Sequence, residues 1–222
     1  MPAEEGVIQP DVVVVASGQG PVVEVPSARA VVAADGGLDR AAALGLVVDV
    51  VVGDLDSVSH AALERAEADG IRVVRHPEAK DATDLELALD EAVALGAESV
   101  LVVASDGGRL DHLLASLLLL GSNRYHALEL DALVGEALVH VIHGERVLRG
   151  EPGELVTLLA LGGSAEGVTT DGLEYALSAE ALEPGSSRGV SNVFAATEAR
   201  VSVARGVLLA VRPDAAGKGR RR

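Results

Sequence analysis

Two carboxylates separated by one apolar residue follow a run of valines at residues 50–57, VVVGDLDS. In an extended backbone, residues i and i+2 point to the same side, so Asp54 and Asp56 are expected to face one way. Carboxylate oxygens suit Mg²⁺, which binds one or two carboxylates and keeps positions for water and substrate phosphates. The competing interpretation is a solvated Asp-Leu-Asp turn in which Gly53 supplies the bend.

Polar residues also follow three other apolar runs that we predict to be strands. In an open parallel sheet, ligands bind beyond the carboxyl ends of the strands, so these residues are expected to share one edge. Crowded carboxylates repel one another unless a cation compensates, which predicts a bound metal ion, a cationic ligand, or both. Besides Asp54 and Asp56, the residues are Asp35, Lys80, Thr83, Asp84, Gly107, Gly108, Arg109 and Asp111.

Several of these residues suit an anion such as a phosphate. The guanidinium fork of Arg109 matches two phosphate oxygens, and the two glycines before it allow close approach of backbone N–H groups. Thr83 and Glu86 form a capping box, and the N-terminus of the helix that they begin carries partial positive charge. Each residue alone also has a structural explanation, for example a surface ion pair between Arg109 and Asp111. The functional hypothesis therefore depends on their joint occurrence at consecutive strand ends.

The elements that must position these residues alternate between Val-rich strands and Ala/Leu-rich helices. Continuous apolar strands that alternate with helices indicate a parallel sheet covered on both faces. The predicted strands are 12–15, 30–34, 47–52, 71–75 and 100–103, and the predicted helices are 38–44, 59–68, 83–95 and 110–120. The last helix is rich in leucine and is expected to be buried.

The pattern changes after residue 134, where strand-like runs at 138–142, 155–161, 199–203 and 207–211 are separated by Gly-rich turns. Helical periodicity is weak there, which favours short antiparallel strands. The predicted fold is a three-layer α/β domain with a parallel sheet at 1–134, followed by an all-β sandwich domain at 135–222. We expect the basic tail at 217–222 to be disordered.

Composition excludes several classes of protein. A net charge of −16 over 222 residues argues against nucleic acid as the main partner. The absence of Cys excludes disulfides, thiolate zinc sites and a cysteine nucleophile. No signal peptide or apolar run of membrane-spanning length is present, and we expect a cytoplasmic protein without a membrane partner. The chain has no Walker A sequence, no G-x-G-x-x-G, no G-x-S-x-G and no H-E-x-x-H.

The ordered set of motifs resembles the thiamin pyrophosphokinase (thiamine diphosphokinase) family. The matching segments are Asp35-Gly36-Gly37, GDLDS at 53–57, KDATDLELAL at 80–89, GGRLDH at 107–112, GLEYAL at 172–177 and Ser191-Asn192. They span most of the chain, and GDLDS, TDLELAL and GGRLDH in this order are a specific signal. The chain departs from the family in lacking a Trp after the Ser-Asn segment, where Thr197 lies nearby, and in having Ala104 where many members have Gly. Phe194 is expected to supply part of the missing contact.

The resemblance implies a homodimer that transfers the terminal diphosphate of ATP to the hydroxyl of thiamine, with Mg²⁺, and releases AMP. It implies that Ser191 and Asn192 bind thiamine across the dimer interface. The implied metal ligands are Asp54, Asp56 and Asp84. The implied catalytic residues are Asp35, Asp54, Asp56, Asp84, Arg109 and Asp111, and those implied to bind ATP are Lys80, Thr83, Gly107, Gly108 and Arg109.

Two other functions stay open from the sequence. One is a diphosphokinase for another small hydroxymethyl substrate, such as a pterin. The other is a non-catalytic module that binds nucleotide or thiamine. Phosphoryl transfer needs mostly positioning and charge stabilisation, and the sequence does not identify a dedicated base. Asp35 and Asp111 are the two candidates to accept the proton of the attacking hydroxyl.

Overall fold

A computed structural model describes residues 7–216, and the basic tail predicted to be disordered lies outside the described residues. Contacts divide the chain into two compact units, each described here by itself. The α/β unit consists of Ile8–Ser116 and Leu128–Gly135. The β-rich unit contains Leu117–Ala127 and the described residues from Glu136 onward.

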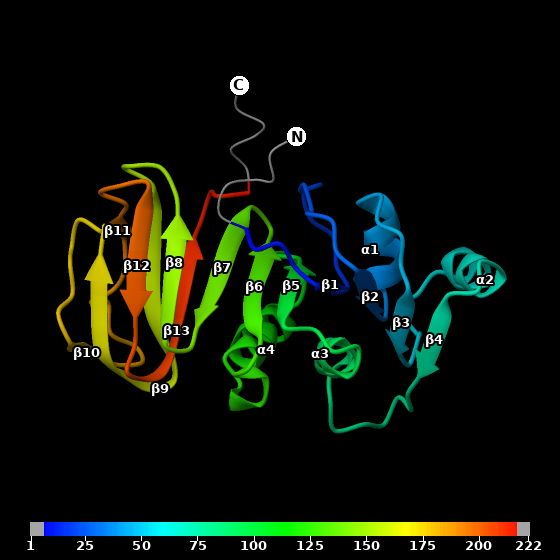
Figure 1. The fold of residues 1–222 in the computed structure, drawn as a ribbon. Helices are drawn as coiled ribbons and strands as arrows, with labels where there is room; N and C mark the ends of the chain where they lie inside the picture. The colour runs from blue at the N-terminus through cyan, green and yellow to red at the C-terminus, as the bar shows by residue number, and fades with distance from the viewer. Residues whose placement is uncertain (1–6, 217–222) are drawn as a thin grey trace. The chain divides into compact units, whose positions relative to one another are not determined.

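The α/β unit contains a sheet of parallel strands in the order β4-β3-β2-β1-β5-β6 (Figure 1). All four valines of β1 are fully buried, because this central strand is covered on both faces. The carboxyl ends of the parallel strands share one edge of the sheet, as the sequence predicts. The strands are β1 (Val12–Val15), β2 (Ala30–Ala34), β3 (Val50–Gly53), β4 (Arg72–Arg75), β5 (Ser99–Ala104) and β6 (Glu129–Val134).

Two predicted helix starts are confirmed by their capping bonds. The hydroxyl of Ser59 accepts a hydrogen bond from the Ala62 amide, and the hydroxyl of Thr83 accepts one from the Glu86 amide at 3.2 Å. The apolar face of α3 is buried and packs on β1, β2 and β3, so its first turn is fixed beside the carboxyl ends of these strands. The helices are α1 (Gly37–Ala43), α2 (His60–Ala68), α3 (Asp84–Ala94) and α4 (Leu110–Leu120), followed by the 3₁₀ helix η1 (Asn123–Tyr125).

The prediction that helix 110–120 is buried is wrong. Leu120 is the buried residue of α4, whereas Leu110, Leu114 and Leu118 are 67%, 52% and 60% exposed. Their spacing of four residues puts these three leucines on one side of the helix. The three leucines therefore form an exposed apolar stripe on α4.

The β-rich unit is antiparallel and is organised around the long strand β9. Residues 157–161 of β9 pair with β13, whereas its end, 169–171, pairs with β12, which in turn pairs with β8. Leu148, Val156 and Leu208 are among the buried residues of the core that these strands enclose. The strands are β7 (Ala137–Ile142), β8 (Glu145–Arg149), β9 (Leu155–Asp171), β10 (Glu180–Leu182), β11 (Asn192–Val193), β12 (Glu198–Ser202) and β13 (Arg205–Arg212).

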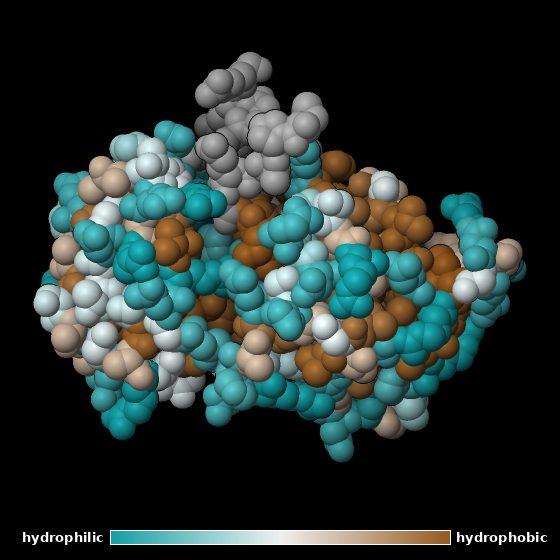
Figure 2. Space-filling model, viewed as in Figure 1, coloured by the Kyte–Doolittle hydropathy of each residue, from teal (hydrophilic) through white to brown (hydrophobic). Residues whose placement is uncertain are grey.

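Hydrophilic residues cover much of the visible surface (Figure 2), as the charged composition of the chain leads one to expect. Figure 2 shows hydrophilic residues in teal spread over the visible face, with hydrophobic residues in brown between them. Among residues 7–216, no helix has the length and hydropathy needed to cross a membrane.

Candidate functional site

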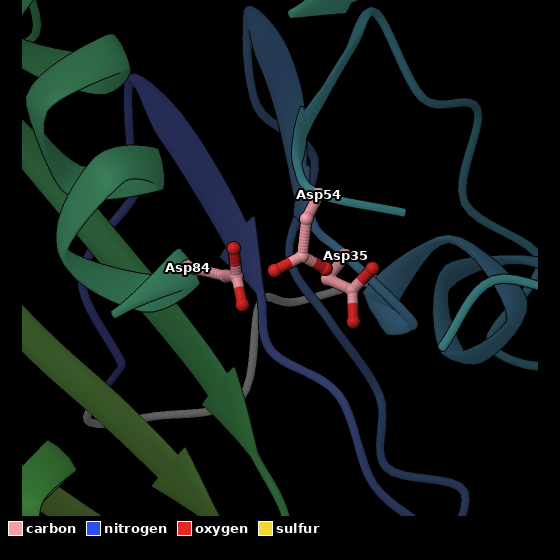
Figure 3. Close-up of side chains that lie close together, drawn as sticks. All are labelled: Asp35, Asp54 and Asp84. Atoms are coloured by element: carbon pink, nitrogen blue, oxygen red, sulfur yellow. The ribbon is translucent and has the colours of Figure 1, made fainter. Parts of the chain in front are cut away.

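Three carboxylates converge at the edge of the sheet in the α/β unit, and we call them the acidic cluster. Asp35, Asp54 and Asp84 each offer one oxygen, and these oxygens lie within 4.8 Å of one another. Asp35 follows β2, Asp54 follows β3, and Asp84 is the first residue of α3. Figure 3 shows the three side chains turned toward a common space. The prediction that strand ends and the start of α3 bring carboxylates together is confirmed for these three residues.

The backbone around the acidic cluster has an unusual conformation. Asp35 has a φ of 48°, in the left-handed region that non-glycine residues rarely adopt, and its amide donates to the Val52 carbonyl at 2.8 Å. Gly53 has a φ of 150°, and a Cβ there would lie 3.0 Å from Asp84 Oδ1. Such conformations persist where the surrounding fold enforces them and are frequent at functional sites. Gly53 therefore leaves the space that the carboxylates surround.

The cluster has the donor set and the unsatisfied oxygens that a hard divalent cation requires. Asp35 is 4% exposed, and neither its Oδ1 nor the Oδ1 of Asp84 makes a hydrogen bond. Burial raises the pKa of Asp35, because its charged form loses hydration. Buried oxygens without a donor are costly unless a cation coordinates them. Asp35, Asp54 and Asp84 therefore fit Mg²⁺, which prefers carboxylate oxygens.

Lys80 is the positive group that contacts the acidic cluster. Its Nζ donates to Asp54 Oδ2 at 2.6 Å and lies 3.0 Å from Asp84 Oδ1, outside hydrogen-bond geometry. The lysine side chain is only 13% exposed. The hydrogen bond from Lys80 lowers the pKa of Asp54, which keeps that carboxylate ionised. The family resemblance implies that Lys80 binds ATP, and in the structure its ammonium group lies among the carboxylates.

The expectation that Asp54 and Asp56 face one way along an extended backbone is wrong. Leu55 between them has a φ of 67° and is buried, so the chain turns here. The turn directs Asp54 into the acidic cluster, whereas Asp56 is exposed and accepts a hydrogen bond from the Ser57 hydroxyl at 2.9 Å. Asp35 takes the place beside Asp54 that we had predicted for Asp56.

Arg109 and Asp111 form the surface ion pair that was the structural alternative for these residues. The Arg109 Nη2 and Nε lie 2.6 and 3.1 Å from the two carboxylate oxygens of Asp111, and the side chains are 70% and 64% exposed. The hydrogen bonds from Arg109 lower the pKa of Asp111 to about 2. Asp111 is therefore a weak proton acceptor, and of the two candidate bases Asp35 has the more basic carboxylate.

The loop after β5 contains the two predicted glycines and contacts the loop after β1. The Gly107 amide donates to the Ser105 hydroxyl at 3.0 Å, and this hydroxyl donates to the Gln19 carbonyl. Gly108 has a φ of 89°, so the turn needs a glycine there. Sequence reasoning missed Ser105 as the residue that joins these two loops, although its position at a strand end was a usable signal.

In the β-rich unit, Asn192 is engaged within the protein. It is 4% exposed, its side-chain oxygen accepts from the Tyr175 amide at 3.0 Å, and its side-chain nitrogen donates to the Tyr175 carbonyl at 2.9 Å. We call this pair of bonds the Asn192 clamp. Ser191, which precedes it, has a φ of 57° and donates its amide to the Thr157 hydroxyl at 3.1 Å. The two residues are adjacent in sequence but differ in what they offer a ligand, because only Ser191 is exposed.

Tyr175 is a residue that the sequence did not single out as a ligand contact. Its side chain is 61% exposed, whereas Tyr125 and Phe194 are 2% and 1% exposed. The prediction that Phe194 contacts the substrate is therefore wrong. Phe194 packs beneath Arg212, whose guanidinium carbon lies 5.5 Å from the ring centroid and which forms a buried ion pair with Glu154. Of the chain's three aromatic residues, Tyr175 is the one that a ligand can reach.

A parallel α/β unit that carries an acidic cluster, followed by a β-rich unit, defines a class of two-domain enzymes. The chain matches the thiamin pyrophosphokinase catalytic domain over residues 24–130 and the thiamin pyrophosphokinase vitamin B1 binding domain over residues 139–208. It therefore belongs to the thiamin pyrophosphokinase family, whose members are transferases of thiamine biosynthesis.

Individual relatives agree with this assignment. The thiamine pyrophosphokinase of Bacillus subtilis is 24% identical over 170 residues, which are 76% of this chain and 79% of the relative. Its crystal structure has a TM-score of 0.76, with 21% identity over 90% of this chain and 98% of that chain. A family protein from Enterococcus faecalis has a TM-score of 0.74 and 26% identity over 90% and 97% of the two chains. The enzyme from Candida albicans has a TM-score of 0.72, with 15% identity over 95% and 94%.

Proposed function

We propose that this enzyme transfers the terminal diphosphate of ATP to the hydroxyl of thiamine in a Mg²⁺-dependent reaction that gives thiamine diphosphate and AMP. The observation that carries the proposal is the acidic cluster. Its three carboxylates come from separate elements, and two of its buried oxygens have no hydrogen bond. Family membership supports thiamine as the acceptor. A cytoplasmic location stays a prediction from the sequence.

In the proposed reaction, the hydroxyl oxygen of thiamine attacks the β-phosphorus of ATP. A new oxygen–phosphorus bond forms as the bond between the β-phosphorus and the oxygen bridging it to the α-phosphorus breaks, and AMP leaves with that electron pair. The hydroxyl proton passes to a carboxylate or to water. Of the two candidate carboxylates, Asp111 is a weak acceptor because the hydrogen bonds from Arg109 lower its pKa to about 2, and Asp35 would have to accept the proton on an oxygen that does not hold the metal ion.

The residues of the α/β unit have distinct proposed roles. Asp54 and Asp84, together with Asp35, hold the metal ion, and Asp56 stays a predicted further ligand from the sequence. When bound, Mg²⁺ neutralises charge on the phosphate oxygens and helps to align them. The N-terminus of α3 at Thr83 adds partial positive charge at the same edge. Arg109 and the glycine loop before it are proposed to bind the phosphates, which requires the guanidinium to exchange Asp111 for the nucleotide.

In the β-rich unit, Ser191 and Tyr175 are the proposed contacts for thiamine. The exposed ring of Tyr175 offers an aromatic face to a cationic thiazolium, a pairing that is favourable when water is excluded. Asn192 acts by holding the Tyr175 backbone at both its N–H and its carbonyl. This arrangement supplies an aromatic contact in a chain that has no Trp.

A homodimer is part of the proposal, supported by the exposed leucines of α4. We expect light scattering to give twice the chain mass for the wild type and a single chain mass for Leu114→Glu, because a carboxylate at the centre of the stripe would be desolvated in an interface. Val93→Glu is the matched control, because Val93 is a 48% exposed apolar residue on α3. A monomeric wild type would contradict the dimer.

Product analysis tests the proposed reaction directly. We expect incubation with ATP, Mg²⁺ and thiamine to give equal amounts of thiamine diphosphate and AMP by mass spectrometry, and none without a divalent cation. A hydroxymethyl pterin in place of thiamine is the control for the alternative acceptor. Formation of ADP, or diphosphorylation of the pterin but not of thiamine, would refute the proposal.

A further inference from the structure

The ammonium group of Lys80 lies against two of the three carboxylates of the acidic cluster. It lies 2.6 Å from an oxygen of Asp54 and 3.0 Å from an oxygen of Asp84, two of the three carboxylates that fit a metal ion. The lysine and Asp54 side chains are 13% and 15% exposed, so water replaces this contact poorly. The same pair of carboxylates is thus available either to the ammonium or to a metal.

The choice of lysine at this position is unusual for the chain. Among its 18 Lys and Arg residues, the lysines are Lys80 and Lys218, and Lys218 lies outside the described residues. Arginine binds carboxylates through a rigid two-pronged fork, whereas lysine carries a compact point charge on a flexible four-carbon stem. A lysine can therefore fill a cation position and withdraw from it without a change in the backbone.

We propose that Lys80 is a tethered cation that occupies the acidic cluster while no metal is bound, and that an entering divalent cation displaces its ammonium group. The displaced ammonium group would then reach the phosphates of the nucleotide. The second statement rests on the proposed function. The first concerns only the protein and the metal, so it can fail or succeed independently of the reaction.

Charge and size make the two occupants exclusive. The coordinating oxygens lie within 4.8 Å of one another, a span suited to one small cation, whose carboxylate oxygens would be about 2 Å from it. Two positive ions in that space would repel each other strongly, because little solvent lies between them to screen their charges. Without any cation, three carboxylates would be crowded together, so the ammonium also explains how the metal-free protein tolerates the cluster.

Amine labelling measures the displacement. The protein is treated with a limiting amount of an amine-acylating reagent, with and without Mg²⁺, and acylation is quantified by peptide mass spectrometry. We expect Mg²⁺ to increase acylation of Lys80 severalfold, because an amine that has left its two carboxylates is more accessible to the reagent than one that is 13% exposed. Lys218 serves as the internal reference. Unchanged or decreased labelling of Lys80 relative to Lys218 would overturn the proposal.

Binding of Mn²⁺ to the nucleotide-free protein provides the second test, measured by the loss of the electron paramagnetic resonance signal of free Mn²⁺. We expect Lys80→Met to bind Mn²⁺ about tenfold more tightly than the wild type, because a competing charge is removed. Lys80→Gln is the second variant in case Lys80→Met does not fold. Lys80→Arg retains the positive charge and should bind Mn²⁺ no more tightly than the wild type. Arg72→Met removes an exposed charge from the far end of β4 and should have no effect.

The outcomes separate this inference from the proposed function. If Lys80→Met and Lys80→Gln bind Mn²⁺ more weakly than the wild type or equally well, Lys80 only positions the carboxylates. This result would overturn the inference but not the metal site. No Mn²⁺ binding by the wild type or by any Lys80 variant would overturn the metal site and the inference together. Neither experiment measures turnover, so a failure of the proposed reaction leaves both readouts intact.

Discussion

The acidic cluster and the Asn192 clamp use their buried polar atoms in opposite ways. In the cluster, one oxygen of Asp35 and one of Asp84 are buried without a hydrogen bond. In the clamp, the amide of Asn192 uses both its oxygen and its nitrogen on the backbone of Tyr175. The buried Asp35 oxygen without a hydrogen bond lowers stability until a metal ion coordinates it, whereas the satisfied bonds of the clamp contribute to stability at all times. The first region is therefore built to receive charge, and the second is built to hold a shape.

The largest effect is expected from Asp54→Asn. We predict that kcat falls about a thousandfold, because the variant loses a charged ligand that acts on the reacting phosphates. AMP formation at saturating ATP, Mg²⁺ and thiamine is the measurement. Asp69→Asn, an exposed change at the end of α2, is the control and should retain normal activity. Near-normal turnover by a folded Asp54→Asn protein would show that the charge of the acidic cluster is not needed for catalysis, and the contrast with the clamp would fail.

Asn192→Ala should act on thiamine binding instead. We predict a rise of about thirtyfold in KM for thiamine and an unchanged KM for ATP, because two hydrogen bonds worth about 1 kcal/mol each hold Tyr175. Asn192→Asp is the matched variant. Its carboxylate still accepts from the Tyr175 amide but cannot donate to the carbonyl, so an intermediate KM is expected. Equal rises in both KM values would mean that Asn192 serves only the general fold.

Replacement of the Tyr175 ring should have a smaller effect. We predict that Tyr175→Leu raises KM for thiamine about tenfold, whereas Tyr175→Phe, which keeps the aromatic face, changes it by less than about threefold. Steady-state kinetics at saturating ATP is the measurement. Equal KM values for the leucine and phenylalanine variants would exclude an aromatic contact.

The smallest effect is a stability change whose sign should differ between the regions. Burial raises the pKa of Asp35 above its ordinary value of 3.8, so ionised Asp35 costs stability above its folded pKa. Without metal at neutral pH, Asp35→Asn should therefore melt at a higher temperature than the wild type. This advantage should vanish as the pH falls below 3.8, where Asp35 is protonated in both the folded and the unfolded state. Asn192→Ala should melt lower at every pH.

Melting curves recorded in EDTA across this pH range check both expectations. Added Mg²⁺ should reverse the order of the Asp35→Asn variant and the wild type, because only the wild type gains the full set of metal ligands. A lower melting temperature for Asp35→Asn without metal at neutral pH would show that the buried carboxylate is already satisfied.

Much of the α/β unit was predictable because its strands are continuous Val runs bounded by glycines and capping residues. The missed strand β6 contains Asp131, a fully buried acid that interrupts the apolar pattern. The β-rich unit was harder. β8 is rich in charged residues, β10 and β11 are very short, and β9 continues through Gly162 and Gly163, which were interpreted as a turn. Long-range pairing decides such strands, and single-sequence patterns do not contain it.

The sequence predicted that carboxylates would form the candidate site, but it did not predict correctly which carboxylates lie together. Strand-end topology correctly brought Asp35, Asp54 and Asp84 together. The left-handed backbone of Leu55 separated Asp56 from them, and nothing in the residue type of leucine announces that conformation. The Asn192 clamp escaped prediction because it joins the first residue of β11 to a loop residue 17 positions earlier, a contact that no local pattern contains.

Gly53 limits how this enzyme can be redesigned. Any side chain there would begin 3.0 Å from Asp84 Oδ1 on a backbone with a φ of 150° that other residues seldom adopt. A library that randomises the GDLDS segment should therefore retain glycine at this position under selection for activity. A change of ion preference would have to be made at the carboxylates themselves, because position 53 has no space for a side chain.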